Sequence, residues 1–508
     1  MKKTNLKILV LLIPLSFSFT FVCFKYSTLN FQDEWVGRGL YPGLAFFHGL
    51  DFYEPQTGPH VSLYGWSTGL FYSMCGFANT PNQAISLAFM INLFFLISLI
   101  VLLFWKSINL TIKCNILSVS IISSLTCLLT FISLMDGTTD AIFKIHADMP
   151  AMSFLVLSII FFRSYIVKKT KFFLFLTVLN LILSVWAKLP TLPALVFPIL
   201  YLVSEKKFKD IIFYIFFCIG TLLLSILFIT LAYGLDDTKF ILFDHIAANQ
   251  WSDRNLLFNG EKATLVTMTY FEAIPLLFRF LAMYITDYWF FGISAILCLV
   301  ISFSNKFDIQ EKFLFKSLGL IYSLTLPSCL AALSHFGSVE NALFFANFTG
   351  ILCMLALLIT MLKYLTSPIV FAYVIGTISL FCALPILRQA NGIEVSSNLS
   401  AHQQAYEYLK AGNNDIYFGW YPIAHLMVDG ESFTSIESPT WVGMTKPEMI
   451  DFSTDHFPKD AKYLATCKIG YGRTILQRYL GVLDEVDAPE SISSWRIFLP
   501  VEKIIPSD

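Results

Sequence analysis

Long apolar runs dominate this chain and constrain its fold more than any other feature. Of its 508 residues, 56% are hydrophobic and 14% are charged, and the mean hydropathy is +0.68. A soluble domain carries about 25% charged residues, so this chain cannot cover its apolar surface in water. The runs are long enough to cross the hydrocarbon core of a bilayer as helices. The sequence therefore predicts an α-helical polytopic membrane protein.

The first apolar run follows a basic N-terminus and predicts an uncleaved span. Lys2, Lys3 and Lys7 precede the run 8–24, and no small-x-small cleavage site follows it. By hydropathy, about eleven transmembrane helices are expected in all. The other predicted spans are 84–105, 115–134, 151–167, 172–186, 189–203, 211–233, 281–303, 313–332, 342–362 and 368–387.

Basic residues between the predicted spans indicate the orientation of the chain. They gather in alternate loops, and cytoplasmic loops carry an excess of Lys and Arg. We therefore expect the N-terminus in the cytoplasm and the C-terminus outside. The clusters are Lys106 and Lys113; Arg163, Lys168, Lys169 and Lys171; Lys206, Lys207 and Lys209; and Lys306, Lys312 and Lys316. The net charge of −1 gives the chain no overall positive potential that would attract nucleic acid.

Four segments are expected on the outer face, and the last one changes composition sharply. Strand-like runs at 415–420, 462–466 and 495–499 and a helix near 401–410 predict a small α/β domain of about 120 residues. The expected domains are thus a transmembrane domain and a C-terminal periplasmic domain. The outer segments are the loops 25–83, 135–150 and 234–280 and the tail 388–508, and the transmembrane domain is 1–387.

The first outer loop begins with two adjacent carboxylates. Asp33 and Glu34 come shortly after the first span, and Arg38 follows them. Long loops are usually functional, and carboxylates close to the lipid interface form a candidate site. The alternative is a solvated pair at the membrane boundary.

The second outer loop carries Lys144, His146 and Asp148 directly before Pro150. Proline is common in the first turn of a helix, so these side chains are expected near one helix N-terminus, which favours anions. As an alternative, Asp148 only caps that helix.

Lys188 is a cation on the side that the positive-inside rule disfavours. It lies between two predicted spans, in the sequence Val-Trp-Ala-Lys-Leu-Pro, and Pro190, Pro193 and Pro198 predict a break in the helix there. A cation on this side of the membrane, beside a hairpin broken by proline, therefore needs a functional reason. The alternative is that Lys188 extends to lipid phosphates.

In order and spacing these residues resemble the GT-C superfamily of membrane glycosyltransferases. The shared features are acidic residues after the first span, an Asp before Pro150 and the Lys188-Leu-Pro hairpin. The resemblance is closest to the branch with aminoarabinose transferases and protein O-mannosyltransferases. It extends loosely to the range 340–345, where relatives carry an Arg-Tyr pair and this chain has Glu-Asn.

The resemblance implies a polyprenyl-phosphate sugar donor and a GT-C-like fold. The acceptor hydroxyl needs a base, and Asp33 or Glu34 fits that role. Asp148 then orients the acceptor, or holds a divalent cation together with Asp33; relatives differ in metal use, so no metal is assigned. Cations stabilise the leaving phosphate, and four are available: Arg38, Lys144, His146 and Lys188.

The leading functional hypothesis is a glycosyltransferase of a bacterial inner membrane. Its acceptor is an envelope glycan such as lipopolysaccharide, a lipid or a protein. One alternative is a transporter or flippase of lipid-linked substrates, which should show repeats and charged sites at the bilayer midplane. Another is a polymerase or ligase of O-antigen type.

Overall fold

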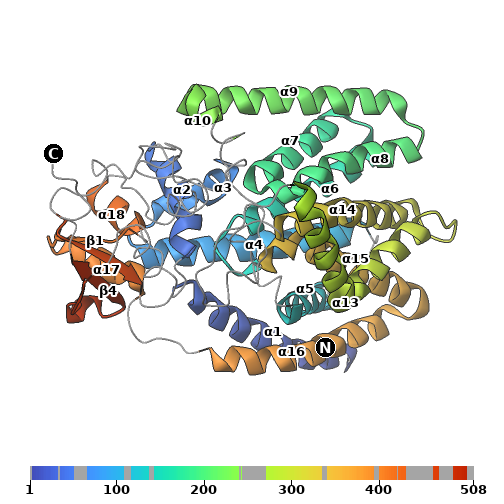
Figure 1. The fold of residues 1–508 in the computed structure, drawn as a ribbon. Coiled ribbons are helices and arrows are strands. Elements are labelled where there is room, and N and C mark those ends of the chain that lie inside the picture. Colours follow the sequence, from blue (N-terminus) through green and yellow to red (C-terminus); the bar gives the residue numbers. More distant parts are fainter. Residues whose placement is uncertain are drawn as a thin grey trace.

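The computed structural model is a bundle of long helices with a small β-sheet at one end (Figure 1). Nothing is described for Asp33 and Glu34, for Lys113, or for residues 51–65 and 243–269. The structure describes residues 3–31, 35–50, 66–107, 116–136, 142–239, 242, 270–333, 340–393, 400–419, 422–430, 461–467 and 484–499.

A helical segment lies at each predicted span. Eight of the described helices are long and apolar enough to cross a membrane, and three shorter apolar segments accompany them. This architecture is that of a polytopic α-helical membrane protein, while the full number of spans stays a prediction. The helices are α1 (Lys3–Asn30), α4 (Pro81–Ser107), α5 (Ile116–Asp136), α6 (Asp148–Lys168), α7 (Lys171–Ala187), α8 (Phe197–Ser204), α9 (Phe208–Tyr233), α13 (Tyr270–Ser302), α14 (Ile309–Leu333), α15 (Phe344–Leu365) and α16 (Pro368–Gly392).

The predicted break next to Lys188 is confirmed. Helix α7 ends at Ala187, and a 3-10 helix, η3 (Leu189–Val196), leads into α8. Pro190 lies in the first turn of η3 and Pro193 lies inside it. Proline has no backbone N–H to donate and so interrupts an α-helix. The break leaves Lys188 in an extended conformation, with φ −156° and ψ 120°, between two helices.

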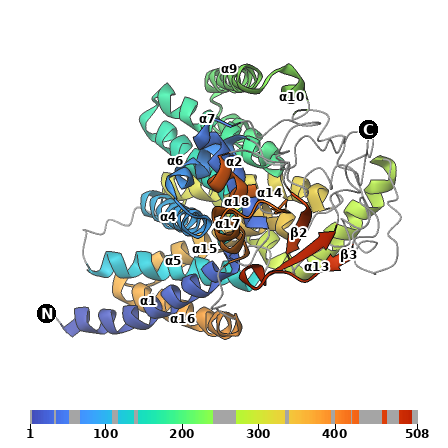
Figure 2. The ribbon, with the colours of Figure 1, turned by 90° about the vertical axis from the view of Figure 1, so that its left-hand side faces the viewer.

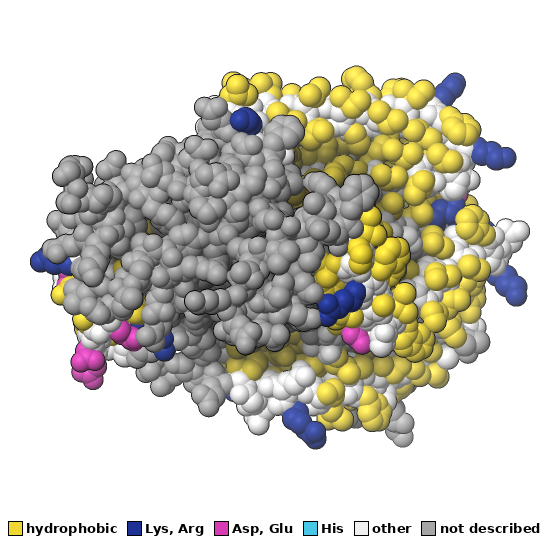
Figure 3. Space-filling view, viewed as in Figure 1, with side chains coloured by type: hydrophobic (Ala, Val, Ile, Leu, Met, Phe, Trp, Pro, Cys, Tyr) yellow, Lys and Arg dark blue, Asp and Glu magenta, His cyan; other side chains and the backbone are white. Residues whose placement is uncertain are grey.

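Three of the basic loops lie together at one end of the bundle, which we call the basic end (residues 163–171, 204–209 and 303–316). Side-chain contacts join these loops: Lys316 Nζ donates to Glu205 Oε1 at 2.9 Å, and Arg163 Nη2 donates to Gln310 Oε1 at 2.7 Å. Figure 3 shows Lys and Arg side chains along this end, on the right, and hydrophobic side chains over the helices beside it. We call the opposite end, next to the β-sheet, the sheet end.

The C-terminal part of the chain forms a four-stranded mixed sheet of order β1-β2-β4-β3. β1 pairs with β2 in parallel, and the other two pairs are antiparallel. Strands lie at the three predicted runs, whereas β3 was not predicted. The elements are α17 (Ala401–Lys410), β1 (Ile416–Tyr417), α18 (Pro422–Asp429), β2 (Tyr463–Cys467), β3 (Asp484–Val486) and β4 (Trp495–Leu499).

The helices beside this sheet pack against the sheet end of the bundle, α17 against α4 and α18 against a layer of short helices. This layer consists of α2 (Trp35–His48), α3 (Trp66–Tyr72) and the 3-10 helix η1 (Ser73–Phe77). Ile423 and Leu426 of α18 join the buried apolar cluster of α2, and Figure 2 shows the two helices side by side. α17 contacts the start of α4, where Asn82 N donates to Gln403 Oε1 at 3.2 Å. Helix α2 is therefore covered by protein on more than one side.

Candidate functional site

Three titratable side chains meet at the sheet end of the bundle. Asp148 is the first residue of α6 and is fully buried. His146 Nδ1 lies 2.6 Å from Asp148 Oδ2, and Lys188 Nζ donates a hydrogen bond to Asp148 Oδ1. We call His146, Asp148 and Lys188 the Asp148 cluster. Each oxygen of the buried carboxylate is thus engaged by a different nitrogen.

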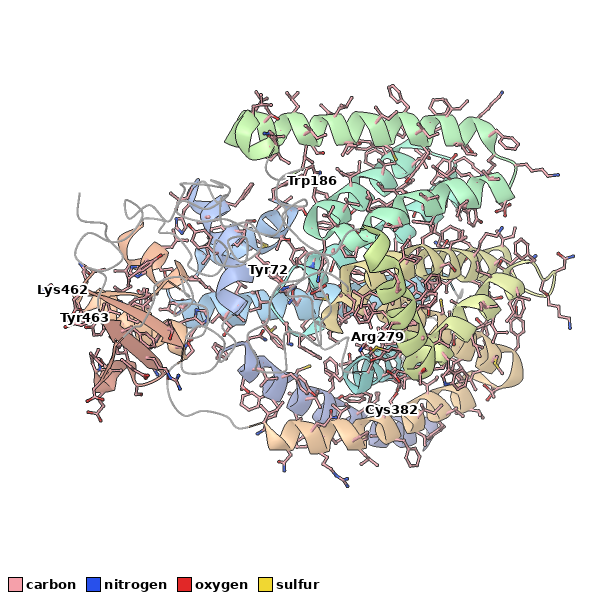
Figure 4. All side chains as sticks on the ribbon, viewed as in Figure 1. Tyr72, Trp186, Arg279, Cys382, Lys462 and Tyr463 are labelled. Atoms are coloured by element: carbon pink, nitrogen blue, oxygen red, sulfur yellow. The ribbon has the colours of Figure 1, made fainter. Side chains whose placement is uncertain are left out.

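The hairpin around Lys188 is fixed by neighbouring helices. The hydroxyl of Thr191 donates to the Lys188 carbonyl at 2.8 Å, and Ser328 of α14 donates to the Pro190 carbonyl at 2.6 Å. The Lys188 ammonium lies 5.9 Å from the ring centroid of Phe345, in the first turn of α15. Trp186 Nε1 donates to Ser225 Oγ at 2.9 Å, which joins the end of α7 to α9 (Figure 4). With the hairpin held in this way, the Lys188 ammonium donates to Asp148.

The loop before Asp148 is held by the end of the first helix. Asn30 Nδ2 donates to the Phe143 carbonyl at 2.8 Å, and the backbone N–H of Ile145 donates to Asn30 Oδ1 at 3.3 Å. Helix α2 also contacts this loop, because a Cβ added at Gly39 would lie 2.2 Å from the Ile145 carbonyl oxygen. Asp33 and Glu34 lie outside the described residues. The helices before and after them in the sequence, α1 and α2, both contact the loop that carries His146.

Tyr72 and Asn92 support the same loop from the other side. The Tyr72 hydroxyl, in α3, donates to Asn92 Oδ1 at 2.9 Å and reaches the His146 carbonyl at 3.3 Å. Asn92 Nδ2, in α4, donates to the Lys144 carbonyl at 3.0 Å. Burial raises the pKa of Tyr72 well above its usual range, so its hydroxyl stays protonated and continues to donate. Figure 4 shows Tyr72 where the short helices meet the bundle.

The exposure of the three side chains suggests how the Asp148 cluster works. The Lys188 and His146 side chains are 17% and 14% exposed, whereas that of Asp148 is fully buried. The carboxylate offsets part of the positive charge and fixes Lys188 Nζ and His146 Nδ1 through its two oxygens, while both of these side chains stay partly exposed. An anion is the ligand that such a pair of nitrogens can bind. Asp148 then positions Lys188 and His146.

The structure tests one of the roles considered for Asp148, that of a helix cap. Asp148 does not cap α6, because Ala147 is the N-cap residue and no side-chain cap hydrogen bond is present. Oδ1 of the carboxylate accepts from the Lys188 ammonium, and Asp33, the second residue of the cation site considered above, lies outside the described residues. Among the described residues, no three His, Cys, Asp or Glu side chains are grouped as metal ligands.

The remaining predicted residues are only partly visible. Lys144 lies in the same loop as His146, and its side chain is exposed. Arg38 lies in the first turn of α2, and its side chain is outside the described part of the chain. The sequence-based prediction missed Asn30 and Asn92, which hold the loop. An amide near or inside an apolar run was the available signal for both.

No protein-family model matches this chain, and no curated protein matches it significantly. Sequence motifs and the geometry of the Asp148 cluster therefore carry the functional argument.

Proposed function

We propose that this protein is a GT-C-type membrane glycosyltransferase that transfers a sugar from a polyprenyl phosphate to an acceptor hydroxyl. The observation that supports this most is the Asp148 cluster, which presents two nitrogens to an anion directly beside apolar helices. A lipid-linked phosphate requires both a cationic and an apolar environment. Cations balance the charge of its phosphate, and its hydrocarbon chain lies against an apolar surface.

The proposed orientation places the basic end in the cytoplasm, in accordance with the positive-inside rule. The Asp148 cluster and the sheet domain then face the periplasm of a bacterial inner membrane. Nucleotide sugars are not expected on that side, whereas a sugar carried on a membrane lipid reaches it through the bilayer. The proposed acceptor is an envelope glycan, a lipid or a protein.

In the proposed reaction the acceptor oxygen attacks the anomeric carbon of the sugar. The bond from that carbon to the phosphate oxygen breaks, and its electron pair stays on the leaving polyprenyl phosphate. Lys188 and His146 stabilise the charge that develops on this phosphate. The acceptor proton passes to a carboxylate, for which we propose Asp33 with support from Glu34. The configuration at the anomeric carbon is inverted in this single displacement.

The position of the Asp148 cluster favours an enzyme over a transporter. A transporter or flippase binds its substrate near the bilayer midplane and opens to both sides. Asp148 is instead the first residue of its helix, and Lys188 is the last residue before η3. A polymerase or ligase of O-antigen type would also transfer a glycan from a lipid carrier, and it differs in using an oligosaccharide on a pyrophosphate.

A reconstituted transfer assay tests the proposal. The purified protein in lipid nanodiscs receives a panel of polyprenyl-phosphate sugars and an extract of envelope glycolipids. We expect release of free polyprenyl phosphate with at least one sugar and a loss of release in Lys188→Met. Lys316→Met is the matched control, because Lys316 is also ion-paired and lies 5.0 Å from the ring centroid of Tyr201, but at the basic end. Equal loss in both variants, or no release by the wild type, contradicts the proposal.

A further inference from the structure

A second polar network lies at the sheet end and was not predicted. Asn347 Nδ2, in α15, donates to the two oxygens of Asp136 at 3.3 and 3.1 Å. The Tyr284 hydroxyl, in α13, donates to Asn347 Oδ1 at 2.8 Å, and it lies 3.1 Å from the Tyr322 hydroxyl of α14. Four helices thus contribute one polar side chain each, and we call these four residues the Asp136 network.

Of the four residues in the Asp136 network, Asp136 is the most exposed. Asn347 is fully buried, Tyr284 and Tyr322 are buried, and Asp136 is partly exposed. Polar groups among apolar helices are costly and usually mark functional sites. Asn347 uses its carbonyl oxygen for Tyr284 and its amide nitrogen for Asp136, so its orientation is fixed. The network therefore holds one carboxylate in a defined position at its open end.

The first turn of α15 contacts both the Asp148 cluster and Asp136. Phe345 lies below the Lys188 ammonium, and Asn347 follows two positions later in the sequence. Ser328 of α14, the helix that also carries Tyr322, donates to the Pro190 carbonyl of the hairpin at Lys188. The two groups of side chains are thus close neighbours at the same end of the bundle.

We propose that Asp136 binds hydroxyl groups of the sugar being transferred, while the Asp148 cluster binds the phosphate to which that sugar is attached. This inference rests on the proposed function. A carboxylate with a fixed orientation accepts hydrogen bonds from hydroxyls. The sugar of such a donor is bonded directly to the phosphate, so its subsite must adjoin the phosphate site. The Asp136 network therefore contributes to recognition of the sugar.

Two probes separate sugar recognition from a structural role. One is polyprenyl monophosphate, which lacks the sugar, and the other is a set of polyprenyl-phosphate hexoses and pentoses. The affinity of the purified protein for each is measured by native mass spectrometry in nanodiscs. The ratio of the two affinities isolates the contribution of the sugar, because the lipid and the phosphate are common to both.

Asp136→Asn is the main variant, because an amide can still accept the hydrogen bond from Asn347 and the fold should persist. We expect its affinity for the best sugar donor to fall about 10- to 100-fold, as when a hydrogen bond to a charged group is lost. Its affinity for polyprenyl monophosphate should be unchanged. Asn347→Ala should act in the same direction. The control is Asn180→Ala, since Asn180 is also a buried amide but donates only within its own helix, to Leu176 O at 2.8 Å.

The outcomes separate this inference from the proposed function. If sugar donors bind and react but the affinity ratio is the same in Asp136→Asn and the wild type, the Asp136 network is structural and the inference is wrong. If neither probe binds the wild type, the proposed function fails, and the inference fails with it. A loss of affinity for both probes in Asp136→Asn, with unchanged thermal stability, also overturns the inference, because it places Asp136 in the phosphate site.

Discussion

Removal of the Lys188 charge should affect both stability and activity, and the structure shows how to separate the two effects. Lys188→Met leaves the fully buried Asp148 carboxylate with only His146 as its partner. Breaking a buried ion pair on one side costs about 3–5 kcal/mol, because an uncompensated charge remains. Loss of activity in this variant alone is therefore ambiguous, because reduced stability also lowers activity.

The double variant Lys188→Met with Asp148→Asn resolves the ambiguity. It removes both charges, and neutral replacement of a whole buried pair is often close to neutral in stability. We expect the thermal unfolding temperature in detergent to return to near the wild-type value. Transfer should remain about 10²- to 10³-fold below the wild type, the loss typical of one removed group that stabilises a transition-state anion. Recovery of transfer together with stability would refute the role of Lys188 in phosphate binding.

A pair at the basic end supplies the control for this experiment. Lys316 and Glu205 form an ion pair at 2.9 Å, but the Glu205 side chain is 38% exposed. Solvent screens such a pair, so Lys316→Met with Glu205→Gln should change stability little. Its transfer rate should equal that of the wild type. A similar loss of transfer in this control would show that charge removal in general, and not the Asp148 cluster, causes the effect.

Three further predictions concern the packing of α2, the proposed base and the orientation of the chain. Gly39→Ala should destabilise the protein by about 1–3 kcal/mol through overpacking, as measured by thermal unfolding, whereas Gly220→Ala, with open space around it, should be neutral. Asp33→Asn should lower the transfer rate by about 10²- to 10⁴-fold without weakening binding of the sugar donor; a normal rate would remove Asp33 as the base. In a cysteine-depleted background, exposed cysteines at Lys206 and Asn413 should be labelled from the cytoplasm and from the periplasm, respectively. Labelling of both from one side contradicts the orientation.

Local features of the sequence were sufficient to predict the helices and the hairpin at Lys188. The length of an apolar run indicates a span, and the prolines after Lys188 break the helix wherever the chain packs. Alternation of the spans also predicted that His146, Asp148 and Lys188 share one side of the membrane, and the structure brings them together at one end of the bundle. Which side of the membrane that is stays a prediction.

Contacts between distant helices could not be predicted in this way. Asp136 and Asn347 are 211 positions apart, and their hydrogen bonds depend on how α5 packs against α15. The same holds for Asp148: its sequence context indicated a helix start, but only packing shows that both of its oxygens are engaged. Packing thus shows that Asp148 holds Lys188 and His146 in place, which its sequence context did not indicate. Packing between helices also explains why Asn30 and Asn92 were missed.

Lipid analysis of cells that lack this protein tests the central claim most directly. Lipid extracts of a deletion strain, and of strains complemented with the wild type or with Lys188→Met and Asp148→Asn, are compared by mass spectrometry. We predict that a polyprenyl-phosphate sugar accumulates in the outer leaflet, where periodate oxidises it in intact spheroplasts. The wild type should remove it and the double variant should not. Accumulation only in the inner leaflet would indicate a flippase, and unchanged lipid-linked sugars would contradict the proposed function altogether.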